Sequence, residues 1–102
     1  MQKINFEAWA EKIPDYTLES LQRYYQYGLP PGSFLTALLQ NDLFGAMATA
    51  DEYNKEALQD ICSFIYWEFP AETYGSEYKV LAYMSQKLAE REKQYAEDNS
   101  NE

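Results

Sequence analysis

The side chains best suited to chemistry are scarce in this sequence, and their spacing builds no catalytic or metal site. The chain has no histidine and a single cysteine, Cys62. Without histidine, the Ser-His-Asp and Cys-His arrangements and the histidine-containing zinc sites are excluded. One cysteine excludes a CxxC motif or a cysteine cluster. The glycines at 28, 32, 45 and 75 match neither a phosphate-binding loop nor a dinucleotide fingerprint.

One short pattern with catalytic precedent remains, the Ser-x-x-Lys spacing of Ser76 and Lys79. Some serine acyl enzymes use this spacing because a lysine one turn on can reach the serine hydroxyl. Ser76 also stands where a helix is expected to begin, and serine is a favoured N-cap. We expect capping. Cys62 lies in an apolar run, so we expect a buried and unreactive thiol. We therefore predict no catalytic residue, no cofactor and no enzymatic activity.

Three carboxylates, Glu52, Glu56 and Asp60, recur every four residues. On a single helix this spacing places them on one face. No other carboxylates are spaced to complete a set of oxygen ligands, so we expect no metal site. The stripe is then either a solvated face or a contact for a basic partner.

Aromatic residues gather in two places, around residues 24–27 and around residues 66–78. Tyrosine and tryptophan are enriched at protein interfaces because they combine a large ring with a polar group. Many of them will lie in the core, with their hydroxyls reaching the surface. The aromatic residues that we expect at an interface are Tyr27, Tyr66, Trp67 and Tyr74.

The net charge of −9 comes from 17 acidic and 8 basic residues, and most of it lies in the second half. Residues 1–50 hold five acids and three bases, net −2, and residues 51–102 hold twelve acids and five bases, net −7. This balance argues against direct nucleic-acid binding and against an anionic membrane surface. It permits a protein partner with a basic surface, although acidity also simply keeps a protein soluble. No signal peptide or membrane span is visible, so we expect a cytoplasmic protein.

Apolar residues recur at helical spacing, and no stretch alternates long enough to form a sheet. We predict an all-α domain over residues 1–96, with five or six helices and a disordered acidic tail at 97–102. The central helices should be short, and longer ones should span 52–68 and 77–96. The expected helices cover about 4–12, 17–27, 34–39, 43–49, 52–68 and 77–96.

The boundaries of these helices carry stop and start signals. Gly28 follows a helix where a left-handed residue is wanted, and Asp42 and Ser76 are expected N-caps. Two further caps have alternatives: Asp15 or Thr17, and Asp51 or Asn54. In the last helix we expect Lys87 on the solvated face and an apolar stripe formed by Val80, Leu81, Met84, Leu88 and Arg91 or Tyr95.

Several segments taken together resemble a known family. They are Tyr24–Leu35 with its Gly-Leu-Pro-Pro-Gly turn, Leu39–Leu43, Ala50–Asn54, Ile65–Pro70 and Gly75-Ser76. The pattern is similar to that of small proteins found widely in bacteriophages and prophages, and it covers about residues 17–83. That family has no established activity, so the resemblance implies an origin rather than a function. The cytoplasm would then be that of an infected host.

Two functional hypotheses follow. The first is a phage-type accessory protein that binds a host or phage protein. In its sharper form the protein inhibits a host defence complex, and its acidic half imitates nucleic-acid phosphates against a basic groove. The alternative is a structural or assembly protein whose copies associate through the aromatic surface.

Overall fold

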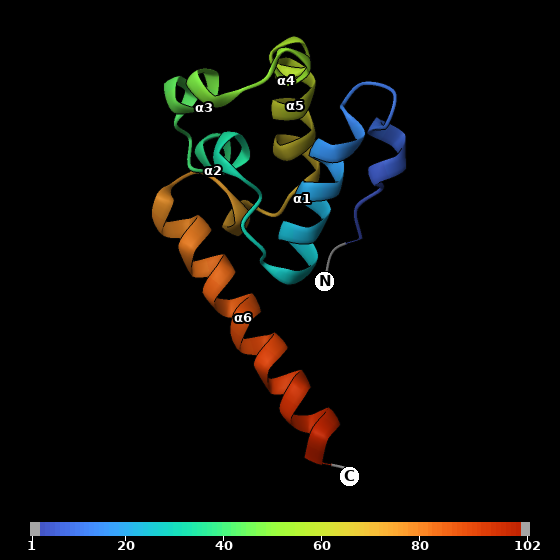
Figure 1. Ribbon diagram of the computed structural model, residues 1–102, viewed down its shortest axis with the longest axis vertical. Coiled ribbons are helices and arrows are strands. Elements are labelled where there is room, and N and C mark those ends of the chain that lie inside the picture. The colour runs from blue at the N-terminus through green and yellow to red at the C-terminus, as the bar shows by residue number, and fades with distance from the viewer. Residues whose placement is uncertain (1–2, 101–102) are drawn as a thin grey trace.

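Helices and their connections build the described chain in the computed structural model, which describes residues 3–100 (Figure 1). There are six α-helices and two short 3-10 helices, and no strand occurs among these residues. The predicted all-α class is confirmed. The elements in chain order are η1 (Phe6–Trp9), α1 (Asp15–Tyr27), α2 (Ser33–Leu39), α3 (Leu43–Thr49), α4 (Glu52–Glu56), α5 (Leu58–Glu68), η2 (Ala71–Thr73) and α6 (Glu77–Ser100).

Helix α1 supplies the centre of the core. Its buried residues recur at three- and four-residue spacing, so they share one face. Leu21 and Tyr24 on this face are completely buried. Helices α2, α5 and α6 add Leu39, Ile61 and Val80 to the core, each at most 1% exposed.

Two tyrosines join α1 to the C-terminal half of the chain. The Tyr24 hydroxyl donates a hydrogen bond of 2.8 Å to the carbonyl of Thr73. The Tyr24 ring lies 5.3 Å from the ring of Tyr83, whose hydroxyl donates to the carbonyl of Tyr25. Burial raises the pKa of both tyrosines, so both hydroxyls remain protonated donors. Both buried hydroxyls therefore have a partner, and α1, η2 and α6 are held together.

Gly28 ends α1 at the point where α6 approaches closely. Its φ is 70°, in the left-handed region, and its N–H donates to the carbonyl of Tyr24. A Cβ at Gly28 would lie 2.4 Å from the Cβ of Lys87. Position 28 therefore requires glycine for two reasons: the left-handed backbone conformation and the close contact with α6.

Most of the predicted caps are confirmed. The side chains of Asp42, Asp51 and Ser76 accept hydrogen bonds from the N–H three residues on, at 2.9, 2.8 and 3.1 Å. The N-terminal cap of α1 was predicted wrongly. Pro14 is the N-cap residue, without a side-chain bond. Thr17 lies inside the helix, where its hydroxyl donates to the side-chain oxygen of buried Asn54.

The predicted helix over 52–68 is wrong as a single element. It breaks at Ala57 (φ −92°, ψ 5°), and α4 and α5 run in different directions (Figure 1). The break follows from tertiary contacts. Asn54 is turned into the core by its bond to Thr17, and Ala57 is itself buried. The N-terminal segment also differs from the predicted helix over 4–12, because only Phe6–Trp9 coils, as a 3-10 helix capped by the Asn5 side chain.

The buried stripe of α6 differs from the predicted one. Lys87, expected in solvent, is only 7% exposed, whereas Leu81, Leu88 and Tyr95 are exposed. Tyr83 lies on the face of α6 that packs against α1, and Lys87 lies one turn further along the same face. The aliphatic stem of Lys87 packs against Gly28, and its ammonium lies 3.3 Å from Glu90.

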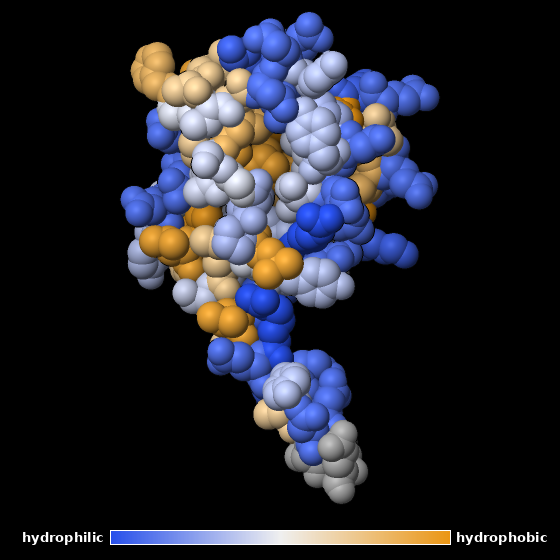
Figure 2. All heavy atoms as spheres, viewed as in Figure 1, coloured by the Kyte–Doolittle hydropathy of each residue, from blue (hydrophilic) through white to orange (hydrophobic). Residues whose placement is uncertain are grey.

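Helix α6 extends well past the body of the molecule. Its second half projects into solvent (Figure 1) and is largely hydrophilic (Figure 2). The helix continues to Ser100, so residues 97–100, which we expected to be disordered, are helical. Residues 101–102 of the predicted tail lie outside the described residues. No helix within residues 3–100 has the length and apolar character that a membrane crossing requires.

The double role of Gly28 is testable by substitution. We expect Gly28→Ala to lower the free energy of unfolding by about 2 kcal/mol or more, since it adds a clash with Lys87 to the cost of a left-handed alanine. Chemical denaturation of the purified variants measures the change.

Gly32→Ala is the comparison in which no clash is expected. Gly32 also has a positive φ, 92°, but a Cβ added there would meet nothing within 4 Å. Its φ of 92° and ψ of 167° lie in a region that is essentially restricted to glycine, so only a conformational cost applies at this position, about 1–3 kcal/mol. A loss of about 1 kcal/mol or less in Gly28→Ala, which is no more than a left-handed alanine costs by itself, would show that the close approach of α6 contributes nothing.

Candidate protein-binding groove

An apolar groove of about 510 Å³ lies between α5 and the α2–α3 hairpin. Leu38, Asn41 and Leu43 form one wall. They come from the end of α2, the connecting turn and the start of α3, and the side chain of Asp42 caps α3. Tyr74, from the segment after η2, completes the lining. We refer to this hollow as the groove.

The exposed face of α5 forms the other wall. Ile61, Phe64 and Ile65 are buried in the core. Cys62, Tyr66 and Trp67 lie on the other side of the helix and are exposed. Tyr66 is 63% exposed and Trp67 73%. Their rings meet edge to face with centroids 4.9 Å apart. This contact limits the ring rotations of both side chains, and two large apolar rings are thereby presented to solvent.

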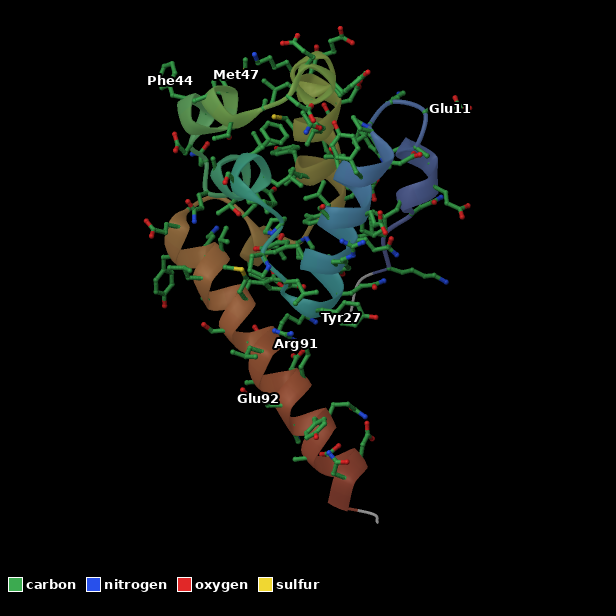
Figure 3. All side chains as sticks on the ribbon, in the orientation of Figure 1. Glu11, Tyr27, Phe44, Met47, Arg91 and Glu92 are labelled. Carbon is green, nitrogen blue, oxygen red and sulfur yellow. The ribbon has the colours of Figure 1, made fainter. Side chains whose placement is uncertain are left out.

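Helix α3 adds further apolar surface beside the groove. It has seven residues and buries only Ala46. Phe44 is 87% exposed and extends away from the molecule, with Met47 also at the surface of α3 (Figure 3). Figure 2 shows hydrophobic residues gathered over α3. Exposed apolar residues that lie together, rather than singly, are typical of interaction sites.

The structure brings three of the four predicted interface aromatics together. Tyr66, Trp67 and Tyr74 all line the groove, and the Tyr74 hydroxyl lies 3.4 Å from the carbonyl of Tyr66. Tyr27 is half exposed but lies at the C-terminal end of α1, far from Phe44 and α3 (Figure 3).

The sequence interpretation missed the α2–α3 side of the groove. The available signal was Leu43-Phe44-Gly45-Ala46-Met47, which has more apolar residues than one face of a seven-residue helix can bury. Cys62 was also placed wrongly, since it is exposed and lines the groove. Partial desolvation raises the pKa of its thiol, so the thiolate that would act as nucleophile is disfavoured.

The predicted acidic stripe is not carried by one helix, because the break at Ala57 places Glu52 and Glu56 on α4 and Asp60 on α5. Glu56 instead shares a second hollow, of about 500 Å³, with Glu11 and Asp15. Glu11 lies on the loop before α1 (Figure 3), and hydrophilic residues cover the α4 end of the molecule (Figure 2). Glu52 pairs with Lys55 at 3.7 Å. We refer to the surface formed by Glu11, Asp15, Glu52 and Glu56 as the acidic end.

A tyrosine–carboxylate pair anchors α4 to α1 beside this end. The Tyr16 hydroxyl donates to Asp51 at 2.5 Å, and the same carboxylate caps α4. This bond raises the pKa of Tyr16 to about 12 and lowers the pKa of Asp51. The raised pKa of Tyr16 adds stability that is complete below pH 10 and lost as pH rises toward 12. The lowered pKa of Asp51 adds stability that is lost in acid, below its ordinary value of 3.8.

The described carboxylates and thiol do not converge as metal ligands. Within residues 3–100, no three His, Cys, Asp or Glu side chains are close enough together to hold a metal ion.

Comparisons with protein-family models, with curated proteins and with solved structures found no match to this chain.

The Tyr16–Asp51 pair is testable by titration. In Asp51→Asn we expect the pKa of Tyr16 to fall from about 12 toward its ordinary 10, because the carboxylate that opposes tyrosinate formation is gone. Asparagine is an equally good N-cap, so α4 should be retained. Carbon-13 NMR of ring-labelled tyrosine follows the ionisation. Tyr16→Phe identifies the signal, and a Tyr16 midpoint unchanged by Asp51→Asn would contradict the assignment.

Proposed function

We propose that this protein acts by binding another protein through the groove. The observation that carries the proposal is the exposed, edge-to-face pair Tyr66–Trp67 beside an apolar hollow. A ring pair held in place gives contact area at little conformational cost on binding. Trp and Tyr are also the residues that most often dominate binding energy.

The phage-like sequence pattern supports an accessory role, in which the bound protein belongs to the host or to the phage. An inhibitor of a host defence complex fits that role. The acidic half suits a partner with a basic surface, and the long-range field of a −9 protein would speed the encounter.

Phosphate mimicry is a second candidate, and the acidic end is the surface that favours it. Glu56, Glu11 and Asp15 surround one hollow there, although Lys12 lines it as well. Replacement of Glu52 and Glu56 by Gln removes two charges from this surface. If mimicry operates, partner binding should weaken most at low salt, where exposed charges are least screened. Binding that is unchanged at low and high salt would exclude it.

The assembly alternative uses the same groove with a second copy as the partner. It requires two chains of charge −9 to associate. Sedimentation over a range of concentrations distinguishes it, since a monomer at tens of micromolar argues against assembly.

The groove proposal predicts a selective loss of binding. We expect Trp67→Ala to reduce capture of a partner at least about tenfold in a tagged pull-down from phage-infected cells, as is typical of a central aromatic residue. Quantitative mass spectrometry of the captured proteins measures the loss.

The control is Tyr95→Ala. Tyr95 is 73% exposed, as Trp67 is, but lies on the distal part of α6. The Tyr95→Ala variant should leave capture of the partner unchanged. A partner that is retained by Trp67→Ala and by Tyr66→Ala would refute the groove as the binding site.

A further inference from the structure

The chemistry of the groove also indicates what binds there, provided that the proposed function is right. We propose that the groove accepts an amphipathic α-helix of a partner protein, with apolar residues on one face and Lys or Arg beside them.

The backbone around the groove favours a helical ligand. An extended peptide gains affinity by pairing with an open sheet edge, and no strand occurs among residues 3–100. Against apolar walls, the N–H and C=O groups of an extended segment would lose water without gaining partners. A helix satisfies its own backbone and can bury one apolar face.

The dimensions fit the spacing of helical side chains. Cys62 and Trp67 are five residues apart on α5, which is about 7.5 Å along the helix axis. Side chains i and i+4 of a docked helix are about 6 Å apart, so two consecutive anchors can enter the groove between these positions.

The charges around the groove favour basic flanks. No lysine or arginine is among the described residues that line it. Asp42 is exposed and lies between the lining residues Asn41 and Leu43. Asp60 precedes Trp67 by seven residues, two turns of α5, so it lies on the same face. Lys or Arg beside the apolar anchors would meet these carboxylates, whereas Glu or Asp would be repelled.

The same reasoning argues against a second copy as the occupant. Within residues 3–100, none of the six α-helices carries a net positive charge. The longest, α6, has five acids and four bases, net −1. A helix of this chain would therefore bring no charge complementarity to the groove.

Three synthetic helical peptides of about 18 residues test the proposal. All carry leucine at i, i+3, i+4 and i+7 spacing, with Lys, Gln or Glu at the other positions. A fourth has the lysine composition with the leucines dispersed around the helix. The readout is the rate at which a disulfide reagent modifies Cys62, the single thiol, which lines the groove. Emission of Trp67 in a Trp9→Phe background gives a second readout.

We expect the lysine peptide to slow Cys62 modification at least about tenfold and to shift Trp67 emission, with a smaller effect at high salt. The glutamine peptide should protect more weakly, and the glutamate and dispersed-leucine peptides should not protect. Asp60→Asn combined with Asp42→Ser, which retains a good N-cap, should reduce the advantage of lysine over glutamine.

Two results would overturn the inference. One is equal protection of Cys62 by the lysine and glutamine peptides, which would show that the ligand needs no basic residues. The other is no protection of Cys62 by any amphipathic peptide, or equal protection by the dispersed-leucine peptide. Either outcome would show that the groove does not select an amphipathic helix. If the pull-down still depends on Trp67 in these cases, the groove remains the binding site and only its occupant is wrong.

Discussion

The contact between the end of α1 and α6 is the constraint on which the rest of this structure depends. Tyr24 and Tyr83 pack against each other, and each donates its hydroxyl to a backbone carbonyl of another element. Because burying an unpaired hydroxyl is costly, these bonds admit few alternative positions for α6 and η2. The left-handed Gly28 then lets the stem of Lys87 pack directly against the chain.

The opposite end of α1 sets the direction of the central segment. Thr17 bonds to buried Asn54, and Tyr16 bonds to the Asp51 cap. These two contacts hold α4 against α1 and separate its axis from that of α5. With α4 turned aside, α5 buries Ile61, Phe64 and Ile65 while Cys62, Tyr66 and Trp67 on its other face stay exposed. The groove is the consequence, since α3 is too short to cover that face.

The surface thus has two unlike regions. The acidic end carries carboxylates around a polar hollow, and the groove carries aromatic rings around an apolar one. A hydrophobic contact supplies affinity through burial, whereas exposed charges mainly change the rate of encounter and its salt dependence. In the proposed mode of action the groove holds the partner and the net charge of the protein attracts it.

Local sequence patterns predict the helical class, the short central helices and the caps at Asp42 and Ser76, because these follow from local periodicity and hydrogen bonds within three residues. For α4 the same patterns leave Asp51 and Asn54 as alternative caps. The sequence also singles out Tyr66, Trp67 and Tyr74, since clustered tyrosine and tryptophan residues are typical of protein interfaces. The break at Ala57, the burial of Lys87, the exposure of Cys62 and the separation of Tyr27 from the other three aromatics appear only in the folded molecule. The break at Ala57 and the burial of Lys87 depend on contacts between residues distant in sequence, Thr17 with Asn54 and Gly28 with Lys87 respectively. Local patterns do not contain those contacts.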